Sequence, residues 1–87
     1  MKADKVKINQ LLKTAAGQIE GISKMVDEDR YCIDISNQIL AVLSILRKAN
    51  NEILSAHMHM CVKEAFDKGN EDEKIEEIIS LINKVSK

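Results

Sequence analysis

The feature that most limits how this chain can fold is a regular apolar pattern through its centre. Between residues 35 and 60, apolar side chains recur at alternating steps of four and three residues, and the 87-residue chain contains no proline. Such steps place side chains on one face of an α-helix, and a sustained seam is typical of helices that pack along their length. The pattern therefore predicts one long helix over about residues 31–67, packed against other helices. The positions are Ile35, Ile39, Val42, Leu46, Ala49, Ile53, Ala56 and Met60.

Two shorter helices are predicted on either side of the long one. Residues 5–27 carry an apolar stripe at steps of three and four residues, and residues 71–86 carry a second stripe. The polar turn at residues 27–30 separates the first two helices, with Asp29 as the expected N-cap of the long helix. The sequence therefore predicts an all-α fold, a three-helix protomer with a long central helix, in one domain over residues 1–87.

The glycines add two local predictions. Gly69 suits the position just past a helix end, and Asn70 with Glu73 has the sequence of a capping box for the third helix. Gly17 and Gly21 lie four residues apart inside the first helix, where each costs about 1 kcal/mol of helix propensity. A close approach of another helix is the expected reason for small residues at these two positions.

Size and composition limit what the chain can be. A chain of 87 residues has a marginal core as a monomer, and the wide apolar face of the long helix predicts self-association. The sequence shows no apolar run long enough for a membrane span and no N-terminal signal peptide. We therefore expect a cytoplasmic protein whose two cysteines, Cys32 and Cys61, are reduced thiols.

Charge is distributed unevenly along the chain. The net charge of −1 argues against generic nucleic-acid binding. Residues 1–48 nevertheless carry eight Lys or Arg against six Asp or Glu, a balance of +2, whereas residues 49–87 carry five against eight, a balance of −3. Solvated helix faces explain such an excess as well as a nucleic-acid surface does.

The stretch His57-Met58-His59-Met60-Cys61 carries side chains that can bind metal. His57 and Cys61 are four residues apart, which places them on one face of a helix, one turn from each other, whereas His59 points elsewhere. An imidazole and a thiolate at this spacing are two arms of a site for a soft metal ion. We interpret Met58 and Met60 as packing residues.

A third ligand, Cys32, can reach this pair only from a second chain. It precedes His57 by 25 residues, about 37 Å along a continuous helix, whereas bonds from metal to sulfur or nitrogen measure about 2.0–2.3 Å. Two long helices packed antiparallel about a two-fold axis near Ile45 and Leu46 bring Cys32 of one chain beside His57 and Cys61 of the other. Two thiolates and one imidazole suit Cu(I), since Zn(II) prefers a fourth ligand. The alternative is a structural cysteine, a core histidine and an unrelated second cysteine.

The residues around this site resemble the copper-sensitive operon repressor (CsoR) family, which also includes nickel/cobalt, formaldehyde and persulfide sensors. The resemblance covers nearly the whole chain, and the Cys–His–Cys spacings of 25 and 4 residues are those of the copper branch. The other branches use an N-terminal histidine, use an N-terminal proline, or lack the histidine between the cysteines. The residues that carry the resemblance are Gly17, Gln18, Gly21, Ile22, Met25, the run Arg30-Tyr31-Cys32-Ile33-Asp34-Ile35, Gln38, Ala41, Val42, His57, Cys61 and Val62.

This resemblance implies a repressor built as an antiparallel dimer and then as a dimer of dimers, a homotetramer. Its metal-free form would bind operator DNA, and Cu(I) binding would release the DNA and derepress copper resistance genes. Cys32 of one protomer and His57 and Cys61 of the other match the family's copper ligands. Tyr31 and Glu77 match the residues that hydrogen-bond the non-ligating histidine nitrogen, which orients the imidazole. An ordinary exposed carboxylate is the alternative for Glu77.

The first helix departs from the family pattern, which reads Arg-Leu-x-Arg-Ile-Glu-Gly-Gln and presents arginines to DNA. Here Leu11 and Thr14 replace both arginines, and Ala16 replaces the glutamate. Lys13 and the pair Arg47-Lys48 are the basic residues that we expect to contact DNA. Because each lost phosphate contact removes one released counterion, we expect weaker DNA binding with a flatter salt dependence.

Two alternatives stand beside a Cu(I)-responsive repressor. Leu11 and Ala15 make the face of the first helix more apolar, as a protein-contacting surface is, which fits a Cu(I)-binding oligomer with weak or lost DNA binding. Cys32 and Cys61 of another chain also suit a thiol or persulfide sensor. An enzyme is not expected, because one His–Cys pair on a helix, with no base-orienting group or pocket evident in the sequence, is thin evidence for catalysis.

Overall fold

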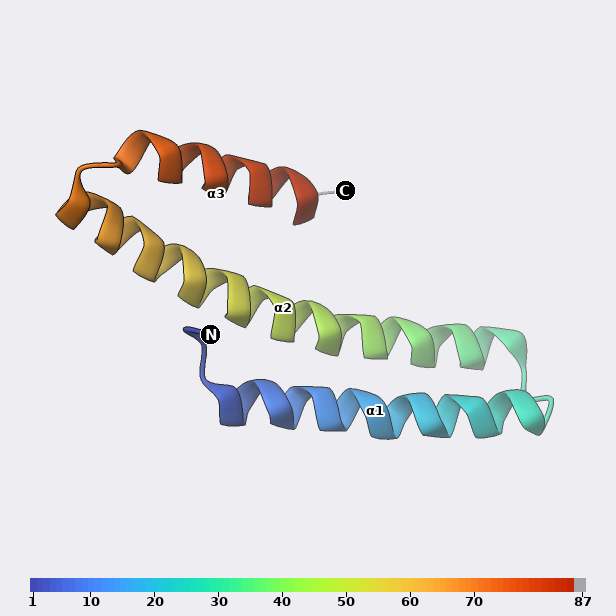
Figure 1. The fold of residues 1–87 in the computed structure, drawn as a ribbon. Coiled ribbons are helices and arrows are strands. Elements are labelled where there is room, and N and C mark those ends of the chain that lie inside the picture. Colours follow the sequence, from blue (N-terminus) through green and yellow to red (C-terminus); the bar gives the residue numbers. More distant parts are fainter. Residues whose placement is uncertain (86–87) are drawn as a thin grey trace.

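The computed structural model describes residues 1–85 and folds them into three α-helices (Figure 1). Helix α1 spans Lys5–Asp27, α2 spans Cys32–Lys68 and α3 spans Glu71–Val85. The predicted all-α class with a long central helix is confirmed, and the described part of the chain contains no strand. The predicted end of the third helix at residue 86 lies outside the described residues.

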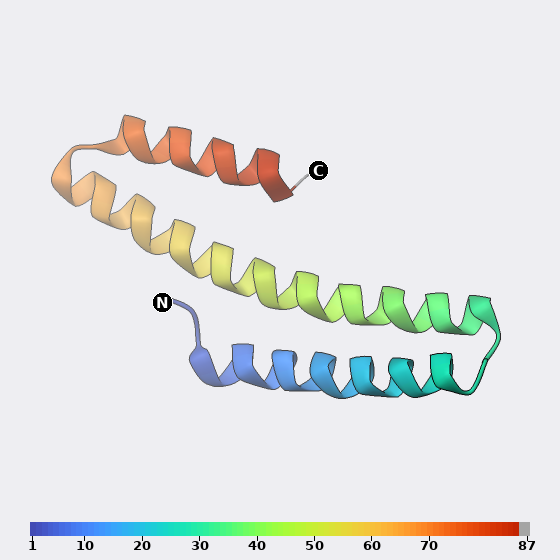
Figure 2. The same ribbon diagram turned by 45° about the vertical axis from the view of Figure 1, so that its right-hand side comes forward.

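The three helices lie in a single layer. α1 runs antiparallel beside the first half of α2, and α3 turns back along the second half of α2 on the opposite side (Figures 1 and 2). The principal extents of 58 × 28 × 12 Å describe a flat, elongated body. Over residues 1–85, α1 and α3 each pack on α2 but not on one another. None of the described helices combines the length and apolar character needed to cross a lipid bilayer.

A small core lies along α2. Ile8 and Ala15 of α1 are buried, as are Val42 and Ala49 of α2. Ala65, near the end of α2, is buried where α3 folds back. Three of these five buried side chains are alanines, so the area that one chain removes from water is small and its hydrophobic stabilisation is correspondingly modest.

Large apolar side chains remain exposed in the protomer. Leu12, Ile19 and Val26 of the α1 stripe and Ile39 and Leu46 of the α2 seam are all exposed, so one chain buries only part of each predicted apolar face. The protomer has an accessible surface of 6735 Å², whereas a compact monomer of 9.8 kDa exposes about 5,200 Å². The excess favours association with further copies of the chain.

Asp4 determines where α1 begins. Its side chain accepts hydrogen bonds from the backbone N–H groups of Val6, at 3.0 Å, and Lys7, at 3.3 Å. These bonds satisfy two of the donors that the first helical turn leaves unpaired. This cap was not predicted from the sequence, although an aspartate directly before a periodic apolar stretch is a usual N-cap signal.

Asp29 ends α1 and does not begin α2. Its backbone has a φ of 53°, in the left-handed region. The N–H of Asp29 donates to Val26 O at 3.1 Å, and that of Arg30 donates to Met25 O at 3.0 Å, which is the Schellman pattern of a helix C-terminus. The predicted N-cap role of Asp29 is therefore wrong. Tyr31 takes that position, without a side-chain hydrogen bond.

Gly69 ends α2 as predicted and sets the direction of α3. Its φ is 74°, and its N–H donates to Ala65 O at 2.8 Å, while the N–H of Asn70 donates to the same oxygen at 3.1 Å. The predicted capping box of Asn70 and Glu73 is wrong, because Asn70 Oδ1 is buried and has no hydrogen-bond partner among residues 1–85.

The close helix approach predicted at Gly17 and Gly21 does not occur within one chain. An added Cβ atom would meet nothing within 4 Å at either position among the described residues. Contacts within the protomer therefore do not explain why two glycines stand in α1, despite their low helix propensity.

Replacing Gly69 with alanine should lower the free energy of unfolding by about 1 kcal/mol, because an L-residue is strained in the left-handed region. The space around the residue is open, so the backbone conformation is the cause. Gly17→Ala is the matched control, because Gly17 lies inside a helix with the same free space and should gain about 1 kcal/mol. Denaturant unfolding at fixed protein concentration, followed by circular dichroism, measures both. Equal shifts in the two variants would contradict this account.

Candidate metal centre

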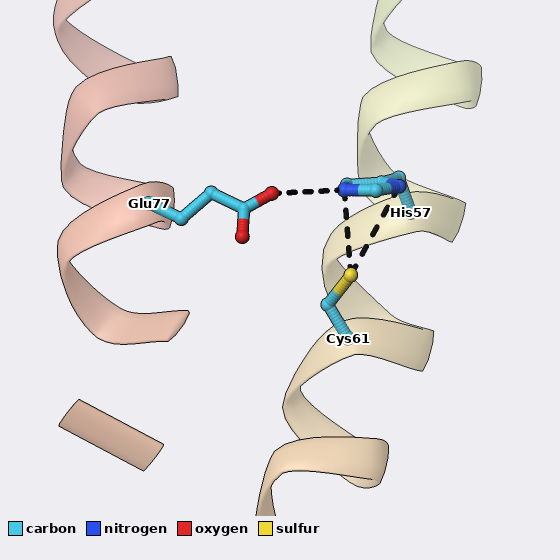
Figure 3. A group of neighbouring side chains, drawn as sticks. All are labelled: His57, Cys61 and Glu77. Carbon is cyan, nitrogen blue, oxygen red and sulfur yellow. Dashed lines mark hydrogen bonds and ion pairs between the residues drawn. The ribbon is translucent and has the colours of Figure 1, made fainter. Parts of the chain in front are cut away.

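Three side chains with metal-binding atoms gather between the second half of α2 and α3 (Figure 3). His57 and Cys61 come from α2 and Glu77 from α3, and one ligand atom of each lies within 4.8 Å of the others. His57 Nε2 is 3.2 Å from Glu77 Oε1 and 3.3 Å from Cys61 Sγ, while His57 Nδ1 is 4.0 Å from the same sulfur. All three side chains are partly exposed and therefore accessible from solvent.

Helix geometry and one turn account for this cluster. His57 and Cys61 stand one helical turn apart on the same face of α2, as their spacing predicts. Glu77 lies in the second turn of α3, and it reaches His57 because the turn at Gly69 reverses the chain (Figure 1). Periodicity alone predicts the contact between His57 and Cys61. The contact between His57 and Glu77 depends on how α3 folds back.

The hydrogen bond to Glu77 gives the two nitrogens of His57 different roles. An ionised carboxylate only accepts hydrogen bonds, so His57 Nε2 carries the proton that it donates to Glu77 Oε1 over 3.2 Å. In the neutral ring the free lone pair is then on Nδ1. We infer this tautomer from the hydrogen-bond partner. Nδ1 is therefore the atom available to a metal ion.

Lys74 holds the second oxygen of the Glu77 carboxylate. Its Nζ is 3.2 Å from Oε2, three residues along the same helix. The hydrogen bond from His57, followed by the hydrogen bond and charge of Lys74, lowers the pKa of Glu77. In turn the hydrogen bond and charge of Glu77, with a smaller effect from Cys61, raise the pKa of Lys74. At neutral pH the carboxylate is therefore ionised and positioned to hold the imidazole.

The imidazole and the thiol are spaced as two ligands of one soft metal ion. Bonds of about 2.0 Å to nitrogen and about 2.3 Å to sulfur, meeting near 120°, separate the two atoms by about 3.7 Å. His57 Nδ1 and Cys61 Sγ are 4.0 Å apart, close to that value. The pair fits a thiophilic ion such as Cu(I) and leaves at least one coordination position for a further ligand.

Glu77 is the alternative third ligand within the same chain. Zn(II) accepts sulfur, nitrogen and carboxylate oxygen together. Both oxygens of Glu77 already have partners, however, because Oε1 accepts from His57 and Oε2 from Lys74. Binding a metal ion through Glu77 would break at least one of these charge-assisted bonds. The arrangement therefore favours a ligand from elsewhere.

Cys32 and Tyr31 lie far from this cluster. Cys32 is the first residue of α2, and its separation of 25 residues from His57 corresponds to about 37 Å along the helix. Both side chains are exposed, and the thiols of Cys32 and Cys61 are free. One chain thus brings His57, Cys61 and Glu77 together and leaves Cys32 and Tyr31 at the other end of α2.

The basic residues predicted to contact DNA are exposed. Lys13 belongs to α1, and Arg47 and Lys48 belong to α2. Lys7 Nζ is 3.0 Å from Glu52 Oε1 across the antiparallel pair. Because the two helices are antiparallel, Lys13, six residues after Lys7, lies level with residue 46, six residues before Glu52. The three basic residues therefore lie at the same height of the α1–α2 pair.

The two α1 positions at which the family pattern has arginine, Leu11 and Thr14, have different surroundings. Thr14 is exposed, and its Oγ1 donates a hydrogen bond to Gln10 O at 2.9 Å. Leu11 is partly buried. The expectation that Leu11 and Ala15 together form an apolar contact surface is wrong for Ala15, which is 2% exposed. Its side chain belongs to the core between α1 and α2.

Three neighbours of the centre could not be identified from the sequence. Lys74 carries only the weak signal of an i,i+3 spacing to Glu77. Met1 and Lys2 line a hollow together with His57 and Glu77, and no periodic pattern in the sequence places the first residues of the chain there. The return of the N-terminal segment to the middle of α2 is visible in Figures 1 and 2.

Comparison with known proteins gives consistent matches. Residues 4–84 match the family described as metal-sensitive transcriptional repressor. The copper-sensing transcriptional repressor CsoR of Bacillus subtilis is 37% identical over 84 residues, which cover 97% of this chain and 83% of that protein. The CsoR of Mycobacterium tuberculosis is 39% identical over 71 residues, covering 82% of this chain. The match spans 60% of that mycobacterial protein's own length.

Solved structures with the same fold include sensors of two different metals. The nickel-responsive transcriptional regulator InrS has a TM-score of 0.86 and 27% identity, covering 98% of this chain and 96% of that one. The copper-sensing repressor CsoR with Cu(I) from Geobacillus thermodenitrificans has a TM-score of 0.84 and 33% identity, covering 100% and 94%. Because the fold serves both metals, the metal must be inferred from the ligand atoms.

Acid should break the link between α2 and α3 by protonating Glu77. Because the pKa of Glu77 is lowered in the folded protein, its contribution to stability is present above the unfolded pKa and is lost as pH falls through the folded pKa. The carboxyl carbon shift in NMR titrations of the metal-free protein reports this value. His57→Ala should raise the pKa of Glu77, because it removes the largest cause of the lowering.

The matched control for that titration is His59→Ala, which removes a histidine from the exposed side of α2. It should leave the pKa of Glu77 where it is in the unaltered protein. If His57→Ala leaves the pKa unchanged as well, the hydrogen bond between His57 and Glu77 does not form in solution.

Proposed function

Because the chain belongs to the metal-sensitive transcriptional repressor family, we propose that it is a Cu(I)-responsive repressor. The metal-free protein binds operator DNA, and it releases the DNA when it binds Cu(I), which derepresses copper resistance genes. Its similarity to copper-sensing repressors supports this assignment. We assign it no catalytic role, and a repressor of this kind acts in the cytoplasm, where its thiols stay reduced.

The observation that carries the proposal is the placement of His57 Nδ1 beside Cys61 Sγ, at 4.0 Å, while Glu77 occupies the other ring nitrogen. The pair offers one soft sulfur and one imidazole nitrogen, with the imidazole already oriented. Cu(I), when bound, supplies a thiophilic centre that draws two thiolates and one imidazole together. A second thiolate completes the set, and Cys32 of another protomer provides it.

An antiparallel dimer supplies that second thiolate. A two-fold axis near Ile45 and Leu46 places Cys32 of each chain beside His57 and Cys61 of the other. The exposed apolar side chains of α2, among them Leu43 and Leu46, become buried in such a dimer. Tyr31 arrives with Cys32 and adds a hydroxyl near the imidazole. The dimer is therefore both the structural unit and the smallest unit that completes a metal site.

A second apolar surface supports further assembly to a dimer of dimers. Leu12, Ile19 and Val26 are exposed and recur every seven residues, so they share one face of α1. This face is separate from the apolar face of α2 that the dimer covers. Two independent apolar surfaces on one protomer suit a tetramer with two kinds of interface.

The metal site couples to the arrangement of the helices through α3. Among the described residues of α3, no side chain is buried, so few contacts hold this helix against α2. The His57–Glu77 hydrogen bond is one of them, and it ends on the imidazole that binds the metal ion. Ligand binding that changes the orientation of this ring, and draws in the partner's Cys32, favours one arrangement of the tetramer over another.

Lys13, Arg47 and Lys48 form the proposed DNA-contacting surface. They are exposed at the same height of the α1–α2 pair, and a two-fold axis repeats them on each protomer. Thr14 replaces an arginine of the family pattern, and its hydroxyl donates a hydrogen bond to the backbone of α1. We therefore expect operator binding with fewer phosphate contacts, and hence a weaker dependence on salt, than an arginine-bearing relative shows.

Mixed dimers test whether the site uses two chains. A heterodimer of one Cys32→Ser chain and one Cys61→Ser chain keeps one complete site, because the intact Cys32 faces the intact His57 and Cys61. It should bind one Cu(I) tightly, where the unaltered dimer binds two and either variant homodimer binds none. Competition with a Cu(I) chelator on heterodimers purified through two tags measures the stoichiometry.

The matched control is a heterodimer of one Cys61→Ser chain and one His57→Ala chain, in which both sites are incomplete. It should bind no Cu(I) tightly, although it carries as many substitutions as the first heterodimer. If the first heterodimer also binds none while the unaltered dimer binds two, the ligands do not come from two chains.

Mobility-shift titrations with the DNA upstream of its own gene test the regulatory function. The reduced metal-free protein should bind, and one Cu(I) per protomer should weaken binding by about 5- to 150-fold, the usual range of allosteric coupling. Arg47→Ala should weaken binding and reduce the salt slope by about one. His57→Ala keeps both thiols and should bind DNA without responding to Cu(I).

Stoichiometric Cu(I) binding without DNA binding in either state would contradict the repressor assignment. It would mean that the metal site stands on a scaffold that no longer binds DNA, consistent with the changes at Leu11 and Thr14.

A further inference from the structure

Lys74 stands beside the metal centre without belonging to its ligands. It lies in the first half of α3, its side chain is 30% exposed, and its Nζ is 3.2 Å from Glu77 Oε2. It also lines an apolar hollow with Val62 and Ile75, while its ammonium group reaches the carboxylate. This position distinguishes it from the other lysine of α3, Lys84, which is exposed near the end of the helix.

The two oxygens of Glu77 have different partners, and this arrangement constrains the carboxylate. Oε1 accepts from His57 Nε2, and Oε2 accepts from Lys74 Nζ, each at 3.2 Å. A carboxylate held at one oxygen alone can still turn about its last bond, whereas one held at both cannot turn without losing a bond. Lys74 therefore fixes the direction in which Oε1 points, which is toward the imidazole (Figure 3).

The charge of Lys74 matters at this place. Two thiolates with one Cu(I) carry a net charge of −1, and the nearby Glu77 carboxylate adds another −1. Such an accumulation of like charge in a partly desolvated site is unfavourable unless a cation lies close. Lys74 is that cation, since its Nζ lies 3.2 Å from Oε2 of Glu77, the carboxylate that holds His57.

We propose that Lys74 is a positioning residue of the Cu(I) centre, an inference that rests on the proposed function. It holds Glu77 so that Oε1 accepts the proton of His57 Nε2, which leaves Nδ1 free for the metal ion, and it offsets the negative charge of the ligand set. An exposed ion pair between residues three apart contributes little by itself to the stability of a helix. This pair does more, because the other oxygen of the same carboxylate, Oε1, accepts from His57 and orients its imidazole.

Three variants separate this role from a general effect of charge. Lys74→Met removes the ammonium group and retains an apolar stem. Lys74→Arg keeps a cation that can still donate to Glu77. Lys84→Met removes one positive charge from the same helix, away from the centre. Circular dichroism and sedimentation confirm that each variant keeps the helices and the assembly of the unaltered protein.

The first measurement needs no metal. In NMR spectra of the metal-free protein, the proton on His57 Nε2 should be visible because its hydrogen bond to Glu77 slows exchange with water. Lys74→Met should lose this signal, while Lys74→Arg and Lys84→Met should retain it. The second measurement is competition with a Cu(I) chelator, in which Lys74→Met should bind Cu(I) about tenfold more weakly and the other two variants should match the unaltered protein.

Retention of the Nε2 proton signal and of Cu(I) affinity in Lys74→Met would overturn the inference. Equal losses in Lys74→Met and Lys84→Met would overturn it too, because the effect would then be one of overall charge. If the unaltered protein fails to bind Cu(I), the proposed function fails, and the Nε2 proton signal alone decides whether Lys74 positions Glu77 and His57.

Discussion

The unbroken length of α2 is the constraint on which the rest of the structure depends. A continuous helix keeps Cys32 about 37 Å from His57, so one chain holds only part of a soft-metal site. The same helix presents an apolar face that one chain leaves largely exposed. The proposed antiparallel dimer would satisfy two requirements at once, burial of that face and completion of the ligand set. In such an arrangement metal affinity and assembly are thermodynamically linked.

A protomer that is one helix thick has little interior with which to resist rearrangement. Its buried side chains are small apart from Ile8 and Val42, and α3 adds none among the described residues. Interfaces between chains must then supply much of the stabilisation. Because interfaces between chains adopt a few discrete packings, the proposed switch would convert a modest change at the His57–Glu77 contact into a new position of a whole helix.

The helices and half of the site were predictable from the sequence because both follow from spacing. The α2 seam predicts a long helix, and the i,i+4 step places His57 beside Cys61 wherever that helix lies. Cap assignments failed at Asp29 and Asn70, since each residue serves the end of the preceding helix instead of the start of the next. Lys74 escaped notice because its role depends on where the turn at Gly69 directs α3.

The residues proposed to bind metal and the positions proposed to affect DNA binding lie on different helices. The fold occurs in a nickel-responsive regulator and in a copper-sensing repressor, so ligand atoms and their hydrogen-bond partners must set metal preference. These atoms lie on α2 and α3, whereas the lost arginine positions, Leu11 and Thr14, lie on α1. No contact joins α1 to α3 among residues 1–85. Under the proposed function, substitutions on α1 would change operator affinity without altering the metal ligands.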